Sequence, residues 1–503
     1  MDVWALMSVS DKTGCDELGY ELTRRGYRIL ATGSTAQYLA SRHIEATTVE
    51  TLTGFGEVLS GRVKTLHPLI YSGILASDSA EHQSQRQALG APDIRVVVVN
   101  LYPFEARWQA GASLTELIEE IDIGGVSLIR AAAKNFRRVT VLTSPTQYPE
   151  YLARPEEENS EPYRQALAVH ALYHVAYYDA VIARALDGDR GTWPEFWVMP
   201  GVKGPALRYG ENPHQPAALY WDPAHTGFAE ATLLQGKTLS FNNYADADTA
   251  VRLAYDFDEP TAVVVKHQTP AAVSVQPTIL DAYRRAYAAD PVSIFGGVVA
   301  VNRPIDGALA QELVSLFLEV VIAPEVTADA RPILAQKKNL RVLIVPPPPV
   351  RNWDVKGIWG GFLVQPADFF ATPMGEWKQV AGPDVRTRAS TRDLDLAWKT
   401  VARVKSNAIV IVKDGVTVGI GGGQTNRIDA ARQALERAGD KARGGVLASD
   451  GFFPFDDVMR LAQECGVAVV IQPGGSVRDQ DSIAVAEQAG VSLLFTGERH
   501  FRH

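Results

Sequence analysis

The chain has few cysteines, no long apolar run and no excess of basic residues. Cys15 and Cys465 lie far apart and match neither a disulfide framework nor a metal motif, which favours a reducing cytoplasm. No segment approaches the roughly 18 apolar residues that cross a membrane, and the start does not look like a signal peptide. The net charge of −9 argues against a general nucleic-acid binder. These absences together predict a soluble cytoplasmic protein.

What the chain does have is length and an ordinary globular composition. At 503 residues it is too long for one core, and 46% apolar with 21% charged residues is typical of soluble domains. We therefore expect two to four domains. The stretch from Asp187 to Pro205 is rich in glycine and proline, which predicts a linker between an N-terminal domain and the rest.

The N-terminal region begins with two strand–turn–helix units. A strand at Trp4–Val9 is followed by the polar turn Ser10–Gly14, and a strand at Tyr27–Ala31 by the turn Thr32–Thr35. Hydroxyls and helix N-termini converging on one spot are typical of a phosphate site. The alternative is ordinary helix capping by Ser10 and Thr35, and the sequence leaves both open.

Four more chemistry-bearing residues of this region stand at the ends of predicted elements. Each could be ordinary surface charge, but as a set they suggest a site: Lys64, Tyr102, Asp122 and Lys134. Farther on, His170 and His174 share helical spacing, yet they lack the glutamate of a zinc motif and a third ligand. We therefore predict no metal.

The centre of the chain carries a buried strand that ends in two titratable residues. Thr261–Pro270 contains three consecutive valines and then Lys266 and His267, after which Pro270 prevents continuation as a central strand. Open α/β folds place their chemistry at such strand ends, and a neighbouring cation favours the neutral imidazole that a general base needs. An exposed Lys-His pair without function is the alternative.

The region after residue 200 contains an internal repeat. Ala262–Lys266 is echoed by Ala408–Lys413, and each is followed by a helical stretch and a Gly-Gly-Val segment 31 or 32 residues after its lysine. Val320–Pro324 and Val469–Pro473 then match as well. Two tandem α/β units with largely parallel strands follow from this order, with a site expected between them at their strand ends.

The two copies differ in their polar residues. The second copy has a plain turn at Lys413–Gly415, and it adds Asn407, the glycine-rich Gly419–Arg427 and a Phe452-Phe453 pair. The glycine run fits no nucleotide fingerprint, so a tight turn before a helix is an equal alternative. The two phenylalanines could stack a planar ring or belong to the core.

Together these segments resemble one known family over essentially the whole chain. It is the family of bifunctional purine-biosynthesis enzymes that combine AICAR (phosphoribosylaminoimidazolecarboxamide) formyltransferase with IMP cyclohydrolase. The matching stretches are Ser8–Gly14, Gly61–Pro68, Asn100–Phe104, Ile121–Asn135, Leu207–Gln215, Ser240–Asp246, Lys266-His267, Asp290–Gly297, Lys405–Arg427, Ser449–Phe455 and Arg499–His503.

The resemblance implies an α/β fold in two parts. Residues 1–195 would form a methylglyoxal-synthase-like parallel-sheet domain with the cyclohydrolase activity. Residues 200–503 would form the transformylase domain, a tandem cytidine-deaminase-like repeat (about 200–365 and 366–503) without the catalytic zinc. The family is homodimeric, with the transformylase site at the subunit interface.

The resemblance also implies residue roles. In formyl transfer from 10-formyltetrahydrofolate to AICAR ribotide, His267 would take the amine proton, Lys266 would stabilise the oxyanion and Asn407 would help position the reactants. Lys64, Tyr102, Asp122 and Lys134 would serve closure of the formamido product to IMP. The residues that would hold the substrates are Ser10, Lys12, Ser34, Thr35, Arg62, Thr65, Arg208, Tyr209, Phe452, Asp457 and Arg499.

One departure and two alternatives complete the expectations. The family usually has Pro-x-Gly after Lys-His, whereas this chain reads Thr269-Pro270-Ala271-Ala272, so we expect a different local turn there. One alternative is a cyclohydrolase with a structural C-terminal domain. The other is a regulatory nucleotide sensor, which would need only the phosphate-binding residues.

Overall fold

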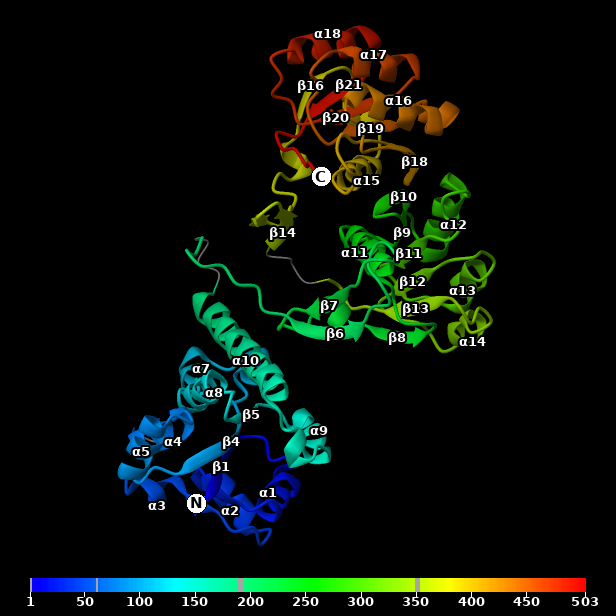
Figure 1. Ribbon diagram of the computed structural model, residues 1–503. Helices are drawn as coiled ribbons and strands as arrows, with labels where there is room; N and C mark the ends of the chain where they lie inside the picture. The colour runs from blue at the N-terminus through cyan, green and yellow to red at the C-terminus, as the bar shows by residue number, and fades with distance from the viewer. Residues whose placement is uncertain (1, 60–61, 189–192, 349–352) are drawn as a thin grey trace. The chain divides into compact units, whose positions relative to one another are not determined.

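The computed structural model describes residues 2–59, 62–188, 193–348 and 353–503 (Figure 1). Gly61 of the matching stretch Gly61–Pro68 and residues 189–192 of the predicted linker lie outside the described residues. The chain divides into two compact units. Unit 1 is Met1–Val202 with Asp222–Ala224, and unit 2 is Lys203–Trp221 with His225–His503.

Unit 1 is built on a five-stranded, wholly parallel sheet in the order β3-β2-β1-β4-β5. The valine-rich β4 is buried along most of its length, as expected for a parallel strand that is covered on both faces. The parallel sheet confirms the predicted fold class. The strands are β1 (Val3–Val9), β2 (Tyr27–Ala31), β3 (Thr47–Thr48), β4 (Asp93–Asn100) and β5 (Thr140–Leu142).

The strand order of unit 1 reverses between β1 and β4, because the chain passes from β1 to β2 on one side and later to β4 on the other. Such a switch point at the carboxyl ends of the strands is where open α/β sheets bind ligands. The helices of unit 1 are α1 (Cys15–Arg24), α2 (Gly33–Ala40), α3 (Val49–Thr53), α4 (Pro68–Leu75), α5 (Ala80–Ala88), α6 (Phe104–Gln109), α7 (Leu114–Glu119), α8 (Gly124–Lys134), α9 (Tyr148–Ala153) and α10 (Glu161–Asp187).

Helix α10 is long and apolar enough to cross a membrane by length and composition alone, which the search for apolar runs did not anticipate. In the structure it packs beside α8 and β5, and Leu167, Ala171, Val175 and Val181 are buried in the core of unit 1. These residues pack within the unit, whereas Val169, Leu172 and Tyr173 of the same helix are exposed.

Unit 2 is built on a twelve-stranded sheet whose two halves have the same strand order. The order is β16-β21-β20-β19-β17-β18-β10-β9-β11-β12-β13-β8, and each strand from β8 to β13 has a counterpart at the mirror position among β16 to β21. The halves join through one antiparallel pair, β10 with β18. This order matches the repeat found in the sequence.

The first half of unit 2 contains β8 (Thr232–Gln235), α11 (Phe241–Tyr255), β9 (Thr261–Lys266), β10 (Thr269–Val275), α12 (Ile279–Ala289), β11 (Val298–Val301), α13 (Gly307–Leu313), β12 (Val320–Ala323), α14 (Ala330–Leu334) and β13 (Arg341–Ile344). The second half contains β16 (Lys378–Ala381), α15 (Thr391–Val401), β17 (Ile409–Lys413), β18 (Val416–Gly421), α16 (Arg427–Ala438), β19 (Val446–Ser449), α17 (Asp457–Glu464), β20 (Val469–Gln472), α18 (Asp479–Ala489) and β21 (Ser492–Phe495). Two further strand pairs are β6 (Val202–Ala206) with β7 (Ala218–Trp221) and β14 (Trp353–Ile358) with β15 (Gly361–Pro366).

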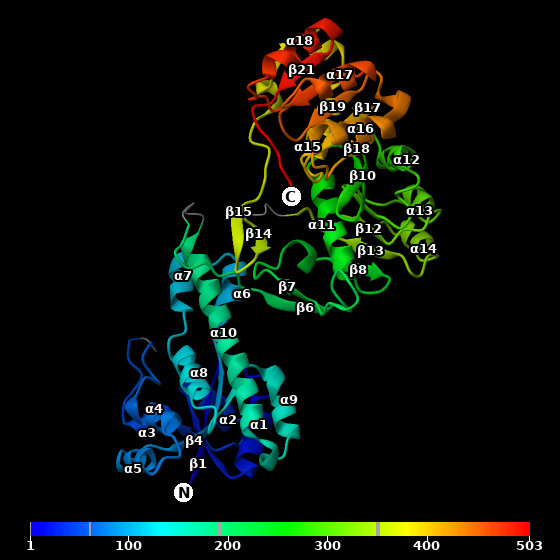
Figure 2. The same ribbon diagram turned by 45° about the horizontal axis from the view of Figure 1, so that its top comes forward.

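Helices cover both faces of this sheet (Figure 2). Helices α11 and α15 lie on one face, where Val263 and Val265 of β9 join their core, while α12, α13 and α14 pack on the other face against Val264. Successive valines of β9 point to opposite faces of the sheet, and all three are buried because helices cover both faces, which explains the valine run. Both faces are apolar.

The prediction of largely parallel strands is wrong for the centre of the sheet. β9 pairs antiparallel with β10 and with β11, and β17 does so with β18 and with β19. The strands β10 and β18 had not been predicted, and β10 is a central strand that contains Pro270. Proline is accommodated there because the pairing with β9 shifts register between Pro270 and Ala272, at a bulge.

Candidate functional site

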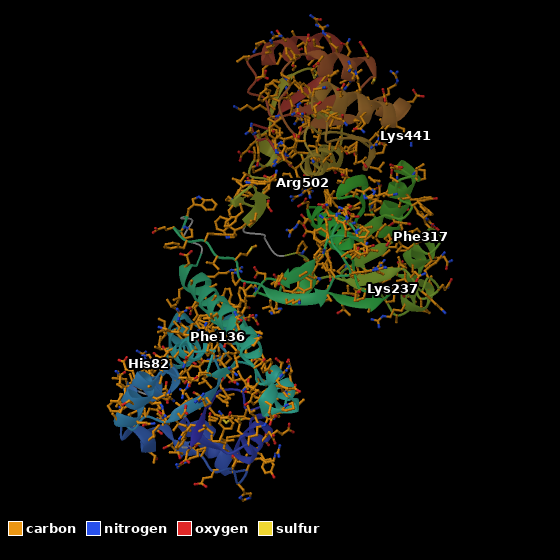
Figure 3. All side chains as sticks on the ribbon, viewed as in Figure 1. His82, Phe136, Lys237, Phe317, Lys441 and Arg502 are labelled. Carbon is orange, nitrogen blue, oxygen red and sulfur yellow. The ribbon has the colours of Figure 1, made fainter. Side chains whose placement is uncertain are left out.

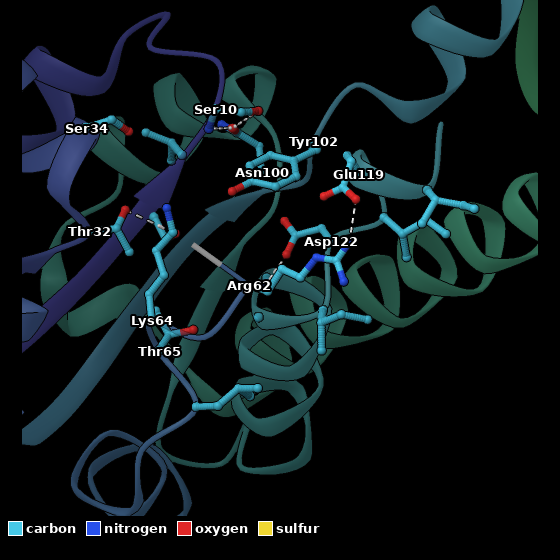
Figure 4. A pocket seen from close by; sticks show the side chains of 18 residues that line it. Ser10, Thr32, Ser34, Arg62, Lys64, Thr65, Asn100, Tyr102, Glu119 and Asp122 are labelled. Atoms are coloured by element: carbon cyan, nitrogen blue, oxygen red, sulfur yellow. Dashed lines mark hydrogen bonds and ion pairs between the residues drawn. The ribbon is translucent and has the colours of Figure 1, made fainter. Parts of the chain in front are cut away.

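At the carboxyl ends of β1 and β4, unit 1 has a cavity of about 390 Å³ (Figure 4). It lies at the switch point of the sheet, where the strand order predicts a ligand. Its lining combines polar and apolar side chains and includes predicted and unpredicted residues. The side chains with polar groups are Ser8, Ser10, Thr32, Ser34, Arg62, Lys64, Thr65, Asn100, Tyr102, Glu119 and Asp122.

The turn after β1 is fixed by Asn100 at the end of β4. The Oδ1 of Asn100 accepts hydrogen bonds from the backbone N–H of Ser10 at 2.5 Å and of Asp11 at 2.9 Å. The hydroxyl of Ser10 also donates to the carbonyl of Leu101 at 2.8 Å. These bonds join the two strand ends on either side of the switch point, so the turn is already shaped for a ligand.

The capping alternative for Ser10 and Thr35 is wrong. The N-cap residues of α1 and α2 are Gly14 and Thr32, and neither makes a side-chain cap. Ser34 instead lines the cavity at the first turn of α2, where free N–H groups favour an anion.

Two predicted phosphate ligands lie behind the cavity. Thr35 is fully buried and its Oγ1 accepts the backbone N–H of Val9 at 3.2 Å. The ammonium of Lys12 donates to the carbonyl of Val9 and approaches the Oγ1 of Thr35 at 3.4 Å. Burial lowers the pKa of Lys12. These two residues hold the strand end, and neither of them lines the cavity.

Asp122 is the half-buried acid of the cavity. Its Oδ1 accepts the N–H of Gly125 at 2.7 Å, and its own N–H donates to the hydroxyl of Tyr178, 2.9 Å away on α10. Burial raises the pKa of Asp122, against the effect of hydrogen bonds from backbone amides and of the nearby Lys64 ammonium. A carboxyl group with a raised pKa in a cleft is typical of proton transfer.

Two cations and a hydroxyl reach the cavity from the segment before α4. Arg62 pairs with Glu119, and Lys64 lies 3.4 Å from a carboxylate oxygen of Glu57. Thr65 is buried, with 4% of its surface exposed. Glu119 and Glu57 partly balance the positive charges of Arg62 and Lys64, as expected for a site that binds and releases a charged ligand.

Lys134 is not brought to this cavity. It is exposed at the far end of α8, nine residues beyond Gly125, which corresponds to about 14 Å along a helix axis. Conversely, Asn100, Glu119, Ser8 and Thr32 line the cavity without having been selected as site residues. Asn100 opens one of the stretches that matched the family, and that was the available signal.

In unit 2, Lys266 and His267 stand at the tight turn between β9 and β10. Lys266 pairs with Thr269 across it, so His267 and Gln268 form a two-residue hairpin loop. Both have positive φ, 54° and 59°, as a type I′ turn requires. The Nζ of Lys266 donates to the carbonyl of Phe295 at 2.9 Å, and the side chain of His267 is exposed.

The Ala272 position is therefore not the strained one. The positive φ values fall on His267 and Gln268, and Ala272 lies within β10. The departure from the family pattern coincides with the bulge of β10. The local turn is a plain hairpin with two unusual residues in it.

Asn407 precedes β17 and is held at both ends of its amide. Its Nδ2 donates to the carbonyl of Gln424 at 2.9 Å, and its Oδ1 accepts from Arg427 at 2.9 Å. Arg427 is itself buried and paired with Asp450, which has no exposed surface. These contacts fix which side of the amide is the oxygen.

The predicted transformylase residues lie along one edge of the sheet. Following the register from β9 through β10 and β18 to β17 places Lys266 and Ile409 at the same edge, and Ser449 pairs with Ile409 there. The hairpin at Asp414 lies at the opposite edge. The two lysine-bearing strands β9 and β17 end at opposite edges, so Lys266 shares its edge with the start of β17 and not with Lys413.

The last residues of the chain also reach this edge. The N–H of His500 donates to the carbonyl of Asp450 at 3.0 Å, and the carbonyl of Arg502 accepts from Ser406 at 2.8 Å. The guanidinium of Arg502 donates to Thr249 on α11 at 3.2 Å. Figure 3 labels Arg502. The tail thereby contacts both halves of unit 2, and Arg499 within it is exposed.

The other residues predicted to bind the substrates of unit 2 are Phe452, Asp457, Arg208 and Tyr209. Phe452 is 38% exposed, whereas Phe453 is buried in the core, so only Phe452 can stack a ring. Asp457 begins α17. Arg208 stacks on Tyr209 at 5.5 Å, in a loop that contacts the start of α11 through Glu211 and Asn242.

No cluster of three or more His, Cys, Asp or Glu side chains suitable for a metal ion occurs in the described part of the chain. His170, one of the pair on α10, lies within 3.3 Å of Thr143 and Gln147. Burial lowers the pKa of its neighbour His174. His170 is thus an exposed histidine with hydrogen-bond partners, and His174 is half-buried, so the two are surface and packing histidines of unit 1.

Comparison with known proteins covers the chain almost completely. A family model described as AICARFT/IMPCHase bienzyme matches residues 132–437, and one described as MGS-like domain matches residues 15–127. The protein named bifunctional purine biosynthesis protein PurH of Thermoanaerobacter sp. (strain X514) is 46% identical over 505 residues, 99% of each chain. The protein of the same name from Deinococcus deserti is 46% identical over 514 residues, again 99% of each. A solved structure named ForH is 32% identical over 37% of this chain, with a TM-score of 0.33.

Proposed function

The chain belongs to the AICARFT/IMPCHase bienzyme family, and we propose that its two units divide the family's two reactions between them. The reactions are the last two steps of IMP biosynthesis: formyl transfer to AICAR ribotide, then dehydrative ring closure to IMP. We assign ring closure to unit 1 and formyl transfer to unit 2. The cavity at the switch point of unit 1 is the observation that carries this assignment, because it is complete within that unit.

For ring closure, the ribotide phosphate binds at the polar end of the cavity. Ser10, Ser34 and the N-terminal amides of α2 offer hydrogen bonds there, while Arg62 and Thr65 lie across the opening. Lys12 and Thr35 support this end from behind. The site as a whole resembles the phosphate sites of other strand–turn–helix units.

The chemistry of closure falls to Lys64, Tyr102 and Asp122. The carboxamide nitrogen attacks the formyl carbon, and water leaves. Lys64 and the hydroxyl of Tyr102 polarise the formyl oxygen, and Asp122 receives the proton of the attacking nitrogen. A raised pKa makes Asp122 a stronger base than an ordinary carboxylate. Lys134 is given no step, because it lies away from the cavity.

For formyl transfer, the co-substrate is 10-formyltetrahydrofolate. His267 takes the proton of the attacking amine, Lys266 stabilises the oxyanion, and Asn407 orients the reactants with its fixed amide. Arg208, Tyr209 and Arg499 hold the ribotide, and Phe452 and Asp457 hold the folate. No metal takes part in this assignment.

We further propose a cytoplasmic homodimer in which a second copy completes the transformylase site. His267 is exposed, and among the described residues it lines neither the cavity of unit 1 nor a hollow of about 340 Å³ between Leu316 and Leu340. A small-molecule site that excludes water encloses most of its ligand, whereas His267 lies at an exposed edge of the sheet.

Two single substitutions test the division of labour. In full-length protein, His267→Ala is expected to lower formyl transfer by about 10²–10⁴-fold and to leave ring closure unchanged. Lys64→Ala is expected to do the reverse. Full formyl transfer in His267→Ala would contradict the role given to His267. No formyl transfer by the unsubstituted chain would favour a cyclohydrolase with a structural unit 2, and no ring closure by that chain would favour a nucleotide sensor.

A further inference from the structure

The hairpin turn that carries His267 has a counterpart in the second half of unit 2, the turn Asp414-Gly415. Lys413 pairs with Val416 across the turn Asp414-Gly415, and these two residues have φ of 54° and 72°. The counterpart is therefore also a type I′ turn. Asp-Gly is a preferred pair for this turn, whereas His-Gln is not, because left-handed φ brings the β-carbon close to the following carbonyl oxygen and is adopted routinely only by glycine and, less often, by Asn and Asp.

A helix carboxylate holds each turn in the same way. The N–H of Gln268 donates to the Oδ1 of Asp246 on α11 at 2.6 Å. In the second half, the N–H of Gly415 donates to the Oδ1 of Asp393 on α15, also at 2.6 Å. Each amide follows its aspartate by 22 residues, so the arrangement was duplicated with the fold.

Asp246 does more for its turn than one bond. Burial raises the pKa of Asp246, while the backbone amides of both Gln268 and His267 and the His267 side chain favour its ionised form. Two amides of adjacent left-handed residues pointing at one carboxylate make a compact anion-binding turn. The carboxylate therefore opposes the unfavourable backbone conformation at the residues where it occurs.

We propose that Asp246 is a positioning residue for formyl transfer, which holds His267 in its left-handed conformation at the edge of the sheet. This rests on the proposed role of His267. Asp246 touches neither substrate, and it acts through the backbone of the turn. Asp393 does the same for a turn without reactive side chains, and it is therefore dispensable for the chemistry.

The test compares the two aspartates in full-length protein. Asp246→Ala is expected to lower kcat for formyl transfer by roughly 10- to 100-fold, with KM for AICAR ribotide and for 10-formyltetrahydrofolate within about twofold. Asp246→Asn keeps one hydrogen-bond acceptor, so its kcat for formyl transfer is expected to lie between those of wild-type protein and Asp246→Ala. Asp393→Ala removes the matching bond in the counterpart turn and is expected to leave kcat unchanged.

A second substitution separates positioning from general damage. In the Asp246→Ala background, Gln268→Gly removes one unfavourable left-handed side chain and is expected to restore kcat about fivefold. Wild-type kcat in Asp246→Ala, an equal loss in Asp393→Ala, or no recovery with Gln268→Gly would each overturn the inference. Full activity in His267→Ala would instead overturn the proposed function, whatever Asp246→Ala does.

Discussion

Gly125 donates its N–H to one carboxylate oxygen of Asp122, and a β-carbon at Gly125 would lie 2.5 Å from the other. The same β-carbon would meet Leu101 at 2.9 Å, and its contact with the carboxylate oxygen can be relieved only if the acid moves. The absence of a side chain at Gly125 is thus what allows Asp122 to sit over the start of α8.

Gly125→Ala is accordingly expected to displace Asp122 and to lower ring closure by about 100-fold, because a shift of about 1 Å at a reacting group costs that much. Formation of IMP from the formamido ribotide measures it. Gly56→Ala in the same unit, where nothing lies within 4 Å, is the control. Equal rates for both variants would contradict the placement of Asp122.

Asp122→Asn is expected to abolish most ring closure and yet to stabilise the fold at neutral pH. Because burial raises the pKa of Asp122, the folded state binds this proton more tightly than the unfolded state does. The ionised carboxylate therefore costs stability above its raised pKa, and this cost vanishes as the pH falls below the ordinary value of 3.8.

Thermal unfolding of wild-type protein and Asp122→Asn at pH 7.5 and pH 4 gives the comparison. The variant is expected to have the higher Tm at pH 7.5, with the difference shrinking towards pH 4. A variant that is less stable by the same amount at both pH values would show that the hydrogen bonds of the carboxylate outweigh its burial.

Asn100→Ala is expected to raise KM for the formamido ribotide about tenfold with a smaller change in kcat. The substitution frees the amides of Ser10 and Asp11, so the phosphate end of the cavity loses its shape before the ligand arrives. Steady-state ring-closure kinetics test this. Asn159→Ala, which removes a bond to Thr140 elsewhere in unit 1, should leave KM unchanged.

The buried pair of Arg427 and Asp450 gives a stability prediction for unit 2. Arg427→Met leaves a buried carboxylate without its cation and is expected to cost about 3–5 kcal/mol of unfolding free energy. Arg427→Met with Asp450→Asn should lose less than Arg427→Met alone, because no unpaired charge remains. Urea unfolding measures both, and a larger loss in the double variant would contradict the pairing.

The two thiols are expected to be slow to alkylate. Burial raises the pKa of Cys15 to about 11, so at pH 8 only about one thiol in a thousand is ionised, and the side chain is fully buried. Cys465 is partly exposed, and its pKa is raised as well. Mass spectrometry after iodoacetamide should find Cys465 modified first and Cys15 modified only on unfolding.

The parts of the fold that the sequence predicts are those with strong local patterns. The valine runs of β4 and β9 predict buried strands, and both strands are buried along most of their length. The repeat of unit 2 was found by comparing the residue spacings of the two copies. The pairing of β10 with β9 was missed, because Pro270 is tolerated only through a bulge that no local pattern announces. Register between distant strands decides such cases.

The candidate site follows the same division. Ser10, Lys64 and Asp122 stand at predicted element ends, and the structure brings them to one cavity. Asn100 was not selected, because its role depends on the turn after β1, ninety residues earlier. Lys134 was selected because it stands at the end of a predicted helix and matches the family, but it lies at the far end of α8, away from the cavity.

The single seam between β10 and β18 has a consequence for biosynthesis. Until β18 has been synthesised, β10 is an unpaired apolar edge strand of the first half of the sheet. Unpaired edge strands can pair with other chains and cause aggregation. Slow translation through residues 276–415 would therefore expose this edge strand for longer and favour aggregation before the second half can cover it.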